Sequence, residues 1–124
     1  MRSILVVEDD AMARKNISTF LTGEGYEIDQ ASDGMEALER LKHRKFDLVL
    51  SDIVMPHMNG LALIDQVCSN WPQIRIIAMT AYFQTGSEKT FWVAGADDFI
   101  RKPIVLNDLL SKIQRVLQSK NSQP

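Results

Sequence analysis

The run Ile4-Leu5-Val6-Val7-Glu8-Asp9-Asp10 decides the fold, because four apolar residues in a row are followed at once by three acids. A strand that is apolar on both faces belongs in the interior of a parallel sheet, between two layers of helices. Residues 48–50 and 74–79 have the same character, and residues 98–100 form a shorter candidate strand. Residues 26–30 alternate between polar and apolar side chains, which predicts a strand at the edge of the sheet.

Segments with apolar residues at helical spacing separate these strands. Asp33 with Glu36, and Thr85 with Glu88, have the spacing of a capping box at the start of a helix. The helix after Thr85 has the weakest pattern of the five. The other four predicted helices contain the apolar stripes of residues 13–21, 34–41, 61–68 and 106–117, and Gly23 and Gly95 stand where helices should end.

Five strands that alternate with five helices predict an α/β fold. We expect a flavodoxin-like, doubly wound parallel sheet with strand order 2-1-3-4-5, which places the alternating second strand at an edge. A chain of 124 residues fits one domain. We place this domain at residues 1–119 and interpret the polar residues 120–124 as a tail or the start of a linker.

The composition is that of an ordinary globular domain, with 45% hydrophobic and 24% charged residues. A net charge of −2 gives no basic footprint for nucleic acid. No apolar run reaches the length of a membrane span, and the N-terminus leads into a strand rather than a signal peptide. The single cysteine, Cys68, has no partner for a disulfide, which fits a reducing compartment. These features predict a soluble cytoplasmic domain that binds neither nucleic acid nor membrane.

Residues that carry chemistry follow the strands at their carboxyl ends. Glu8 and Asp9 follow the first strand, Asp52 the third, Thr80 the fourth and Lys102 the fifth. In a doubly wound sheet the ligand site lies outside these ends, between the first and third strands. Carboxylates held together repel each other, and a hard cation such as Mg²⁺ relieves the repulsion. An aspartate in such a cluster can attack phosphorus and form an aspartyl phosphate.

Four segments, in this order along the chain, resemble the signatures of two-component response regulator receiver domains, members of the CheY-like superfamily. The resemblance covers essentially the whole chain. It implies a phosphoprotein that acts as a switch in phosphorelay signal transduction, and no enzyme activity beyond self-phosphorylation and self-dephosphorylation on Asp52. The segments are residues 4–10, residues 52–60 with the sequence Asp52-Ile53-Val54-Met55-Pro56 and Asn59-Gly60, residues 79–81, and residues 95–103.

The resemblance assigns the acceptor and the metal site residue by residue. It implies that Asp52 is the phosphoacceptor and that Mg²⁺ is the cofactor. The metal ligands would be Glu8, Asp9, Asp52 and the backbone carbonyl of Val54. Asp10, the third acid of the first run, is better interpreted as a cap of the first helix, where a carboxylate is favoured.

The resemblance also implies a switch and its partners. Thr80 would move to a phosphoryl oxygen, Lys102 would contact the phosphate, and Phe99 would be the aromatic switch residue, although an aromatic side chain in an edge strand is also ordinary core. The Lys102-Pro103 bond would be cis. The phosphoryl donor would be a histidine kinase or a histidine phosphotransfer protein. An output domain or effector would bind the face formed by the fourth helix, the fifth strand and the fifth helix.

Alternatives of other classes remain at this point. A phosphohydrolase can use an aspartyl intermediate on a similar sheet, but Val54 leaves no second carboxylate two residues after Asp52 to act as a general acid. A flavodoxin-like cofactor binder would need a glycine-rich phosphate loop after the first strand, where this chain has acids. The receiver itself can be free-standing or part of a longer regulator.

The side chain of residue 54 should control how long a phosphoryl group stays on Asp52. Hydrolysis needs a water in line with the departing carboxylate oxygen. Val54 cannot hold that water and Tyr82 should crowd its approach, so we predict slow self-dephosphorylation. Val54→Asn should decay faster, because an amide can orient the water. The measurement is loss of phosphoryl label from purified protein in Mg²⁺, and decay at or below the parental rate would contradict the prediction.

Overall fold

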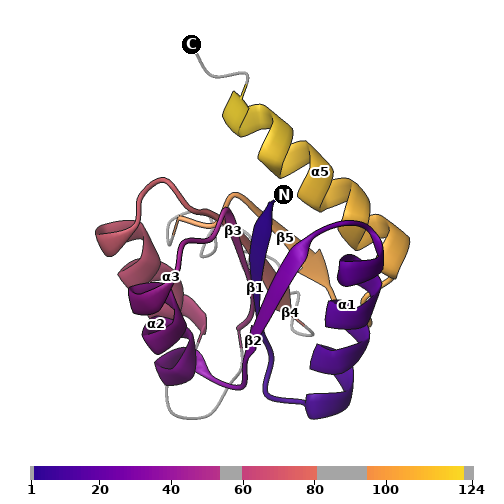
Figure 1. Ribbon diagram of the computed structural model, residues 1–124, viewed down its shortest axis with the longest axis horizontal. Helices are drawn as coiled ribbons and strands as arrows, with labels where there is room; N and C mark the ends of the chain where they lie inside the picture. Colours follow the sequence, from indigo (N-terminus) through magenta and orange to yellow (C-terminus); the bar gives the residue numbers. More distant parts are fainter. Residues whose placement is uncertain (1, 54–59, 81–94, 122–124) are drawn as a thin grey trace.

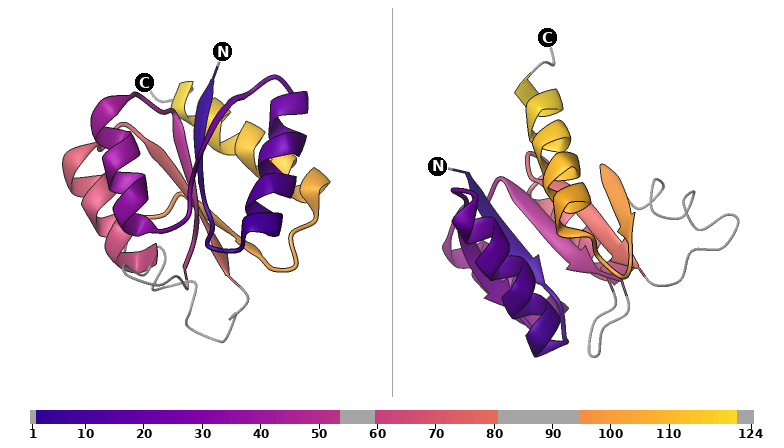
Figure 2. Two further views of the ribbon diagram at one scale, coloured as in Figure 1. Left: turned by 60° about the horizontal axis from the view of Figure 1, so that its bottom comes forward. Right: turned by 90° about the vertical axis from the view of Figure 1, so that its right-hand side faces the viewer.

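The computed structural model describes residues 2–53, 60–80 and 95–121, as one sheet with helices on both faces (Figure 1). Helices α1 (Ala11–Gly23) and α5 (Leu106–Asn121) cover one face of the sheet. Helices α2 (Gly34–His43) and α3 (Gly60–Asn70) cover the other, and Figure 2 shows the three layers from two further sides. Among the described residues, no helix has both the length and the apolar character needed to cross a membrane.

The sheet has the predicted topology. Its five parallel strands lie in the order β2-β1-β3-β4-β5. The helix predicted after Thr85 lies outside the described residues, so the structure describes four of the five predicted helices. Val54 and Tyr82 also lie outside the described residues. The strands are β1 (Ser3–Val7), β2 (Glu27–Ala31), β3 (Leu48–Asp52), β4 (Arg75–Thr80) and β5 (Asp98–Arg101).

Two strands begin one residue later than predicted, because the preceding residue closes a turn instead. The amide of Tyr26 donates to the carbonyl of Leu21 at the end of α1, 3.2 Å away. The amide of Ile74 donates to the carbonyl of Trp71, at 3.0 Å. Apolar character alone cannot separate a turn residue of this kind from the first residue of the strand that follows.

Alternation of side chains along β1 creates two cores. Ile4 and Val6 face α1 and α5, whereas Leu5 and Val7 face α2 and α3. All four are fully buried, and every residue of the neighbouring β3 is buried as well, so the central strands supply both cores at once. This double burial explains why these strands are continuous apolar runs rather than alternating ones.

The predicted caps of α1 and α2 are present, whereas the third, Thr85 with Glu88, lies outside the described residues. Asp10 Oδ1 accepts hydrogen bonds from the amides of Met12 and Ala13, at 3.0 and 3.4 Å, and so caps α1. Asp33 caps α2 by accepting from the amide of Glu36 at 2.8 Å. Helix α1 ends at Gly23 as predicted, but the residue with positive φ is Gly25, at 98°.

Gly60 lets the start of α3 lie against the end of β3. Its amide donates to the carbonyl of Ile53 at 2.7 Å. A Cβ at this position would lie 2.4 Å from the carbonyl oxygen of Asp52 and 2.6 Å from Cα of Ile53. Both neighbours are backbone atoms, so neither can move aside cheaply.

We therefore expect Gly60→Ala to lower the free energy of unfolding by about 1–3 kcal/mol, the usual cost of overpacking. Gly23→Ala is the matched control, because Gly23 is helical and nothing lies within 4 Å of a Cβ built there. That control should be neutral or stabilising by up to about 1 kcal/mol. Urea unfolding of both variants measures the difference, and equal effects would disprove the close approach.

Candidate functional site

The register of the sheet brings the predicted site residues together at the carboxyl ends of the strands. Val7 is paired with Ser51, which places Glu8 beside the end of β3. Asp52 is paired with Met79, the residue before Thr80. The amide of Lys102 donates to the carbonyl of Thr80 at 2.7 Å. Residues from four strands therefore meet outside the carboxyl ends of the sheet, as predicted.

Three carboxylates form a cluster at this edge. Glu8, Asp9 and Asp52 each offer an oxygen, and these oxygens all lie within 4.8 Å of one another. Glu8 is only 1% exposed and Asp52 only 4%, whereas Asp9 faces solvent. Buried carboxylates need paired charge or hydrogen bonds to remain ionised.

Lys102 supplies the opposite charge. Its Nζ donates to Oε1 of Glu8 at 2.7 Å and to Oδ2 of Asp52 at 3.0 Å. Desolvation alone would lower the pKa of the Lys102 ammonium, but the hydrogen bonds with Glu8 and Asp52 outweigh it and raise that pKa above its ordinary value. Lys102 therefore stays protonated between the two carboxylates at neutral pH.

Glu8 is held by a set of donors, some of which the sequence did not reveal. Its Oε2 accepts from the amide of Asp10 at 3.1 Å. Its backbone carbonyl accepts from Nη1 of Arg14 at 2.7 Å. Arg14 lies in the first half of α1 and carries no motif signal, so only the folded arrangement reveals that it positions the acidic loop.

Asp9 is the outer member of the cluster. Partial desolvation raises the pKa of its carboxyl, and the hydrogen bond and charge of Glu8 raise it further. Like charges crowd this edge even with Lys102 present, so a cation would be favoured there.

The donor set fits Mg²⁺. Three carboxylate oxygens from Glu8, Asp9 and Asp52 are hard ligands, and Mg²⁺ uses one or a few carboxylates while keeping several waters. The fourth predicted ligand, the carbonyl of Val54, lies outside the described residues. Among the residues that the structure describes, this cluster contains no nitrogen or sulfur ligand, so zinc fits it less well than Mg²⁺.

The two predicted switch residues lie on neighbouring strands. Thr80 is the last residue of β4 and is 1% exposed. Phe99 is paired with Ala78 in β5, is half-buried, and packs against the core on the α2 and α3 side. The Lys102-Pro103 bond is cis, as the resemblance implied.

Comparisons with known proteins agree with this geometry. Residues 4–114 match the family model of the response regulator receiver domain. The chain is 34% identical over 115 residues to response regulator MprA of Mycobacterium sp. (strain KMS), and the match covers 93% of this chain and 50% of that protein. The same identity and coverage hold for MprA of Mycobacterium leprae (strain TN). The chain thus spans about half the length of the curated relatives it matches.

Solved structures similar in sequence and fold include the following two. A CheY-like response regulator receiver domain protein from Methanospirillum hungatei JF-1 has a TM-score of 0.94 and 31% identity, over 100% of this chain and 99% of that chain. Response regulator TrrA of Thermotoga maritima, solved in complex with Mg²⁺-BeF, has a TM-score of 0.85 and 35% identity, over 94% of this chain and 99% of that one.

Removing the charge of Lys102 should expose the repulsion between Glu8 and Asp52. In a metal-free buffer we expect Lys102→Met to lower the free energy of unfolding by about 2 kcal/mol, less than a fully buried ion pair costs because Lys102 is partly exposed. Excess Mg²⁺ should reduce that loss, because it neutralises the same carboxylates and binds only the folded state.

The matched control is Lys112→Met, since Lys112 has a similar exposure, 27% against 26%, and pairs with Asp98 at 3.5 Å away from the cluster. Its effect should stay below about 1 kcal/mol and should not depend on Mg²⁺. Urea unfolding with EDTA and with Mg²⁺ measures both variants. If Mg²⁺ raised the stability of neither the parent nor Lys102→Met, no cation would bind these carboxylates.

Proposed function

The chain belongs to the family of response regulator receiver domains, and on that premise we propose that it is a phosphorylation-dependent switch with Asp52 as the phosphoacceptor. The observation that carries the proposal is the pairing of Lys102 with both Glu8 and Asp52, at 2.7 and 3.0 Å. It places an ammonium and an acidic cluster around one buried aspartate at the end of β3.

The phosphoryl donor is a phosphohistidine of a histidine kinase or a histidine phosphotransfer protein. An Asp52 carboxylate oxygen attacks phosphorus, a P–O bond forms, and the P–N bond to the imidazole breaks with its electron pair returning to nitrogen. Lys102 holds Oδ2 of Asp52, so it orients the nucleophile and lies next to the incoming phosphoryl oxygens.

Glu8, Asp9 and Asp52 would hold Mg²⁺, together with the backbone carbonyl of Val54. The ion supplies positive charge that stabilises the phosphoryl oxygens during transfer. The cluster of the three carboxylates supports this assignment, and so does the Mg²⁺-BeF complex of the similar TrrA.

The phosphorylated state is read out through Thr80 and Phe99. Thr80 ends β4 at the site edge and Phe99 lies on the adjacent strand, so a movement of the Thr80 hydroxyl toward a phosphoryl oxygen can change how Phe99 packs. Phosphorylation then shifts an equilibrium between two states. The readout surface is the face formed by the fourth helix, β5 and α5. The fourth helix lies outside the described residues.

The domain acts in the cytoplasm as a substrate of other enzymes, with self-phosphorylation and self-dephosphorylation on Asp52 as its own chemistry. Because the MprA relatives are about twice as long as the matched segment, an output domain following a receiver at residues 1–119 is one arrangement, and a free-standing shuttle is the other. Turnover of an added phosphate ester would instead indicate a phosphohydrolase.

Phosphorylation should depend on Asp52 alone among the acids of this edge. Incubation with acetyl phosphate and Mg²⁺ should add one hydroxylamine-labile phosphoryl group, and Asp52→Asn should abolish it. Asp10→Asn is the matched control, because it removes a charge next to the site while asparagine still caps α1. Intact mass spectrometry measures both variants, and label retained by Asp52→Asn would move the acceptor elsewhere.

A further inference from the structure

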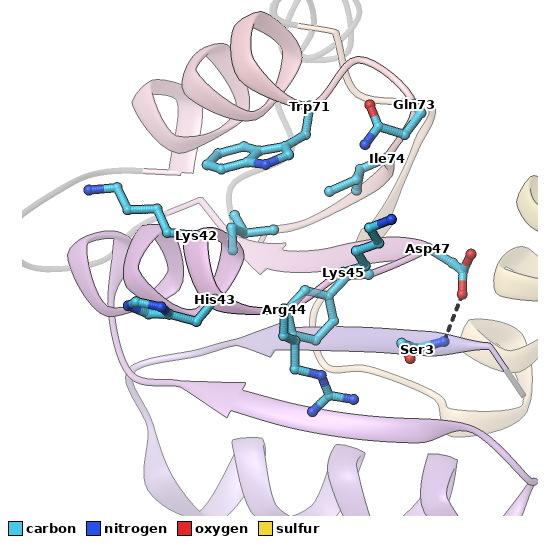
Figure 3. A pocket seen from close by; sticks show the side chains of 11 residues that line it. Ser3, Lys42, His43, Arg44, Lys45, Asp47, Trp71, Gln73 and Ile74 are labelled. Carbon is cyan, nitrogen blue, oxygen red and sulfur yellow. Dashed lines mark hydrogen bonds between the residues drawn. The ribbon is translucent and has the colours of Figure 1, made fainter.

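A groove opens at the amino ends of the strands, at the end of the sheet opposite to Asp52. It has a volume of about 670 Å³ and lies between the end of α2 and the turn that joins α3 to β4. Ser3, Asp47 and Ile74, which line it, stand at or just before the starts of β1, β3 and β4 (Figure 3). None of the residues assigned above to phosphoryl transfer or to the switch lines this groove.

The floor of the groove is apolar and firmly held. Leu41, Phe46 and Ile74 are buried, each at most 6% exposed. Trp71 is half-buried and forms the upper wall, where its ring lies across from α2 (Figure 3). The amide of Trp71 donates to the carbonyl of Val67 at 2.7 Å, which continues the hydrogen bonding of α3 up to the wall. An aromatic side chain on a rigid element is a typical anchor of a binding surface.

The lower wall is cationic. Lys42, Arg44 and Lys45 line the groove, against one carboxylate, Asp47. Asp47 Oδ2 is already used, because it accepts from the amide of Ser3 at 2.8 Å. Among the side chains that line the groove, cations thus outnumber carboxylates, in a chain whose net charge is −2.

The cations differ in how much of their charge is available. Arg44 points away from Trp71 toward β2, where it pairs with Glu27 and Asp29, and its guanidinium lies 4.9 Å from the ring centre of Phe46. Lys42 and the adjacent His43 share the exposed carboxylate of Glu39. Lys45 forms no ion pair with any residue in the described part of the chain, and Figure 3 shows it extending toward Ile74.

Stabilisation of the α2 dipole explains only part of this arrangement. Lys42 and His43 lie in the last turn of α2, where cations are favoured. Lys45 follows α2, and Trp71 follows another helix, α3, so the dipole of α2 accounts for neither. The apolar floor, the aromatic upper wall and the cationic lower wall together match one kind of partner, a chain that presents an apolar side chain between carboxylates.

We propose that this groove binds an acidic peptide segment of a partner protein, with an apolar side chain against Trp71 and carboxylates beside Lys42 and Lys45. Strands of about five residues span roughly 17 Å, so the bound peptide segment and a partner at Asp52 would lie at opposite ends of the strands. Binding does not require phosphorylation, and the proposal is therefore independent of the function proposed above.

The test uses the unphosphorylated protein and a probe peptide, acetyl-Glu-Asp-Phe-Glu-Leu-Asp-amide, in an amide NMR titration. We expect saturable shifts confined to residues 41–47 and 71–74, weakened by added salt. The same peptide with lysine in place of its acids, and the same peptide with glycine in place of phenylalanine and leucine, should each fail to bind. The Asp52→Asn variant should bind the probe as the parent does.

Charge reversal in the groove identifies the site. Lys45→Glu should weaken binding of the acidic probe by about fivefold or more and should allow the lysine peptide to bind. Lys15→Glu, on the exposed surface of α1, changes the net charge equally and should have little effect. Equal weakening by the two variants, binding without the apolar side chains, or the absence of saturable shifts would each overturn the proposal.

Discussion

Two buried carboxylates share one ammonium at the end of this sheet, and the surrounding structure serves that arrangement. Lys102 contacts both Glu8 and Asp52 and so helps to bury the two carboxylates together, and it reaches them because β5 lies in register with β4. The arrangement keeps an excess of negative charge when all three groups are ionised. Stability is thereby exchanged for a site whose charge favours a cation.

Much of this architecture could be predicted because burial leaves a strong pattern in the sequence. The apolar run of β1 and the acids after it follow from a strand covered on both faces with a ligand site at its end. The alternating pattern of β2 correctly marked an edge. The predicted starts of β2 and β4 were one residue early, because Tyr26 and Ile74 form turn hydrogen bonds with residues that precede the strands and are not part of the strand pattern.

Parts of the site depended on tertiary contacts that no local pattern encodes. The sequence indicated that Lys102 lies near the acids, but only the folded chain shows that it contacts both Glu8 and Asp52. Arg14 and the groove beside Trp71 were missed for the same reason, since each joins residues that no motif spaces. Gly60 was quoted as part of a motif, and the structure adds its physical reason in the backbone of Asp52 and Ile53.

The direction of α5 has a mechanical consequence. All five strands run toward the end of the sheet that holds Asp52. The 16 residues of α5 run back, by about 24 Å at 1.5 Å per residue, toward the end where β1 begins (Figure 1). A domain fused after α5 would be attached at the end of the sheet opposite to Asp52 and connected only by its linker. Its local concentration at any surface of the domain would then be set by tether length and stiffness, so shortening or stiffening the tether could retune the response without altering a single contact.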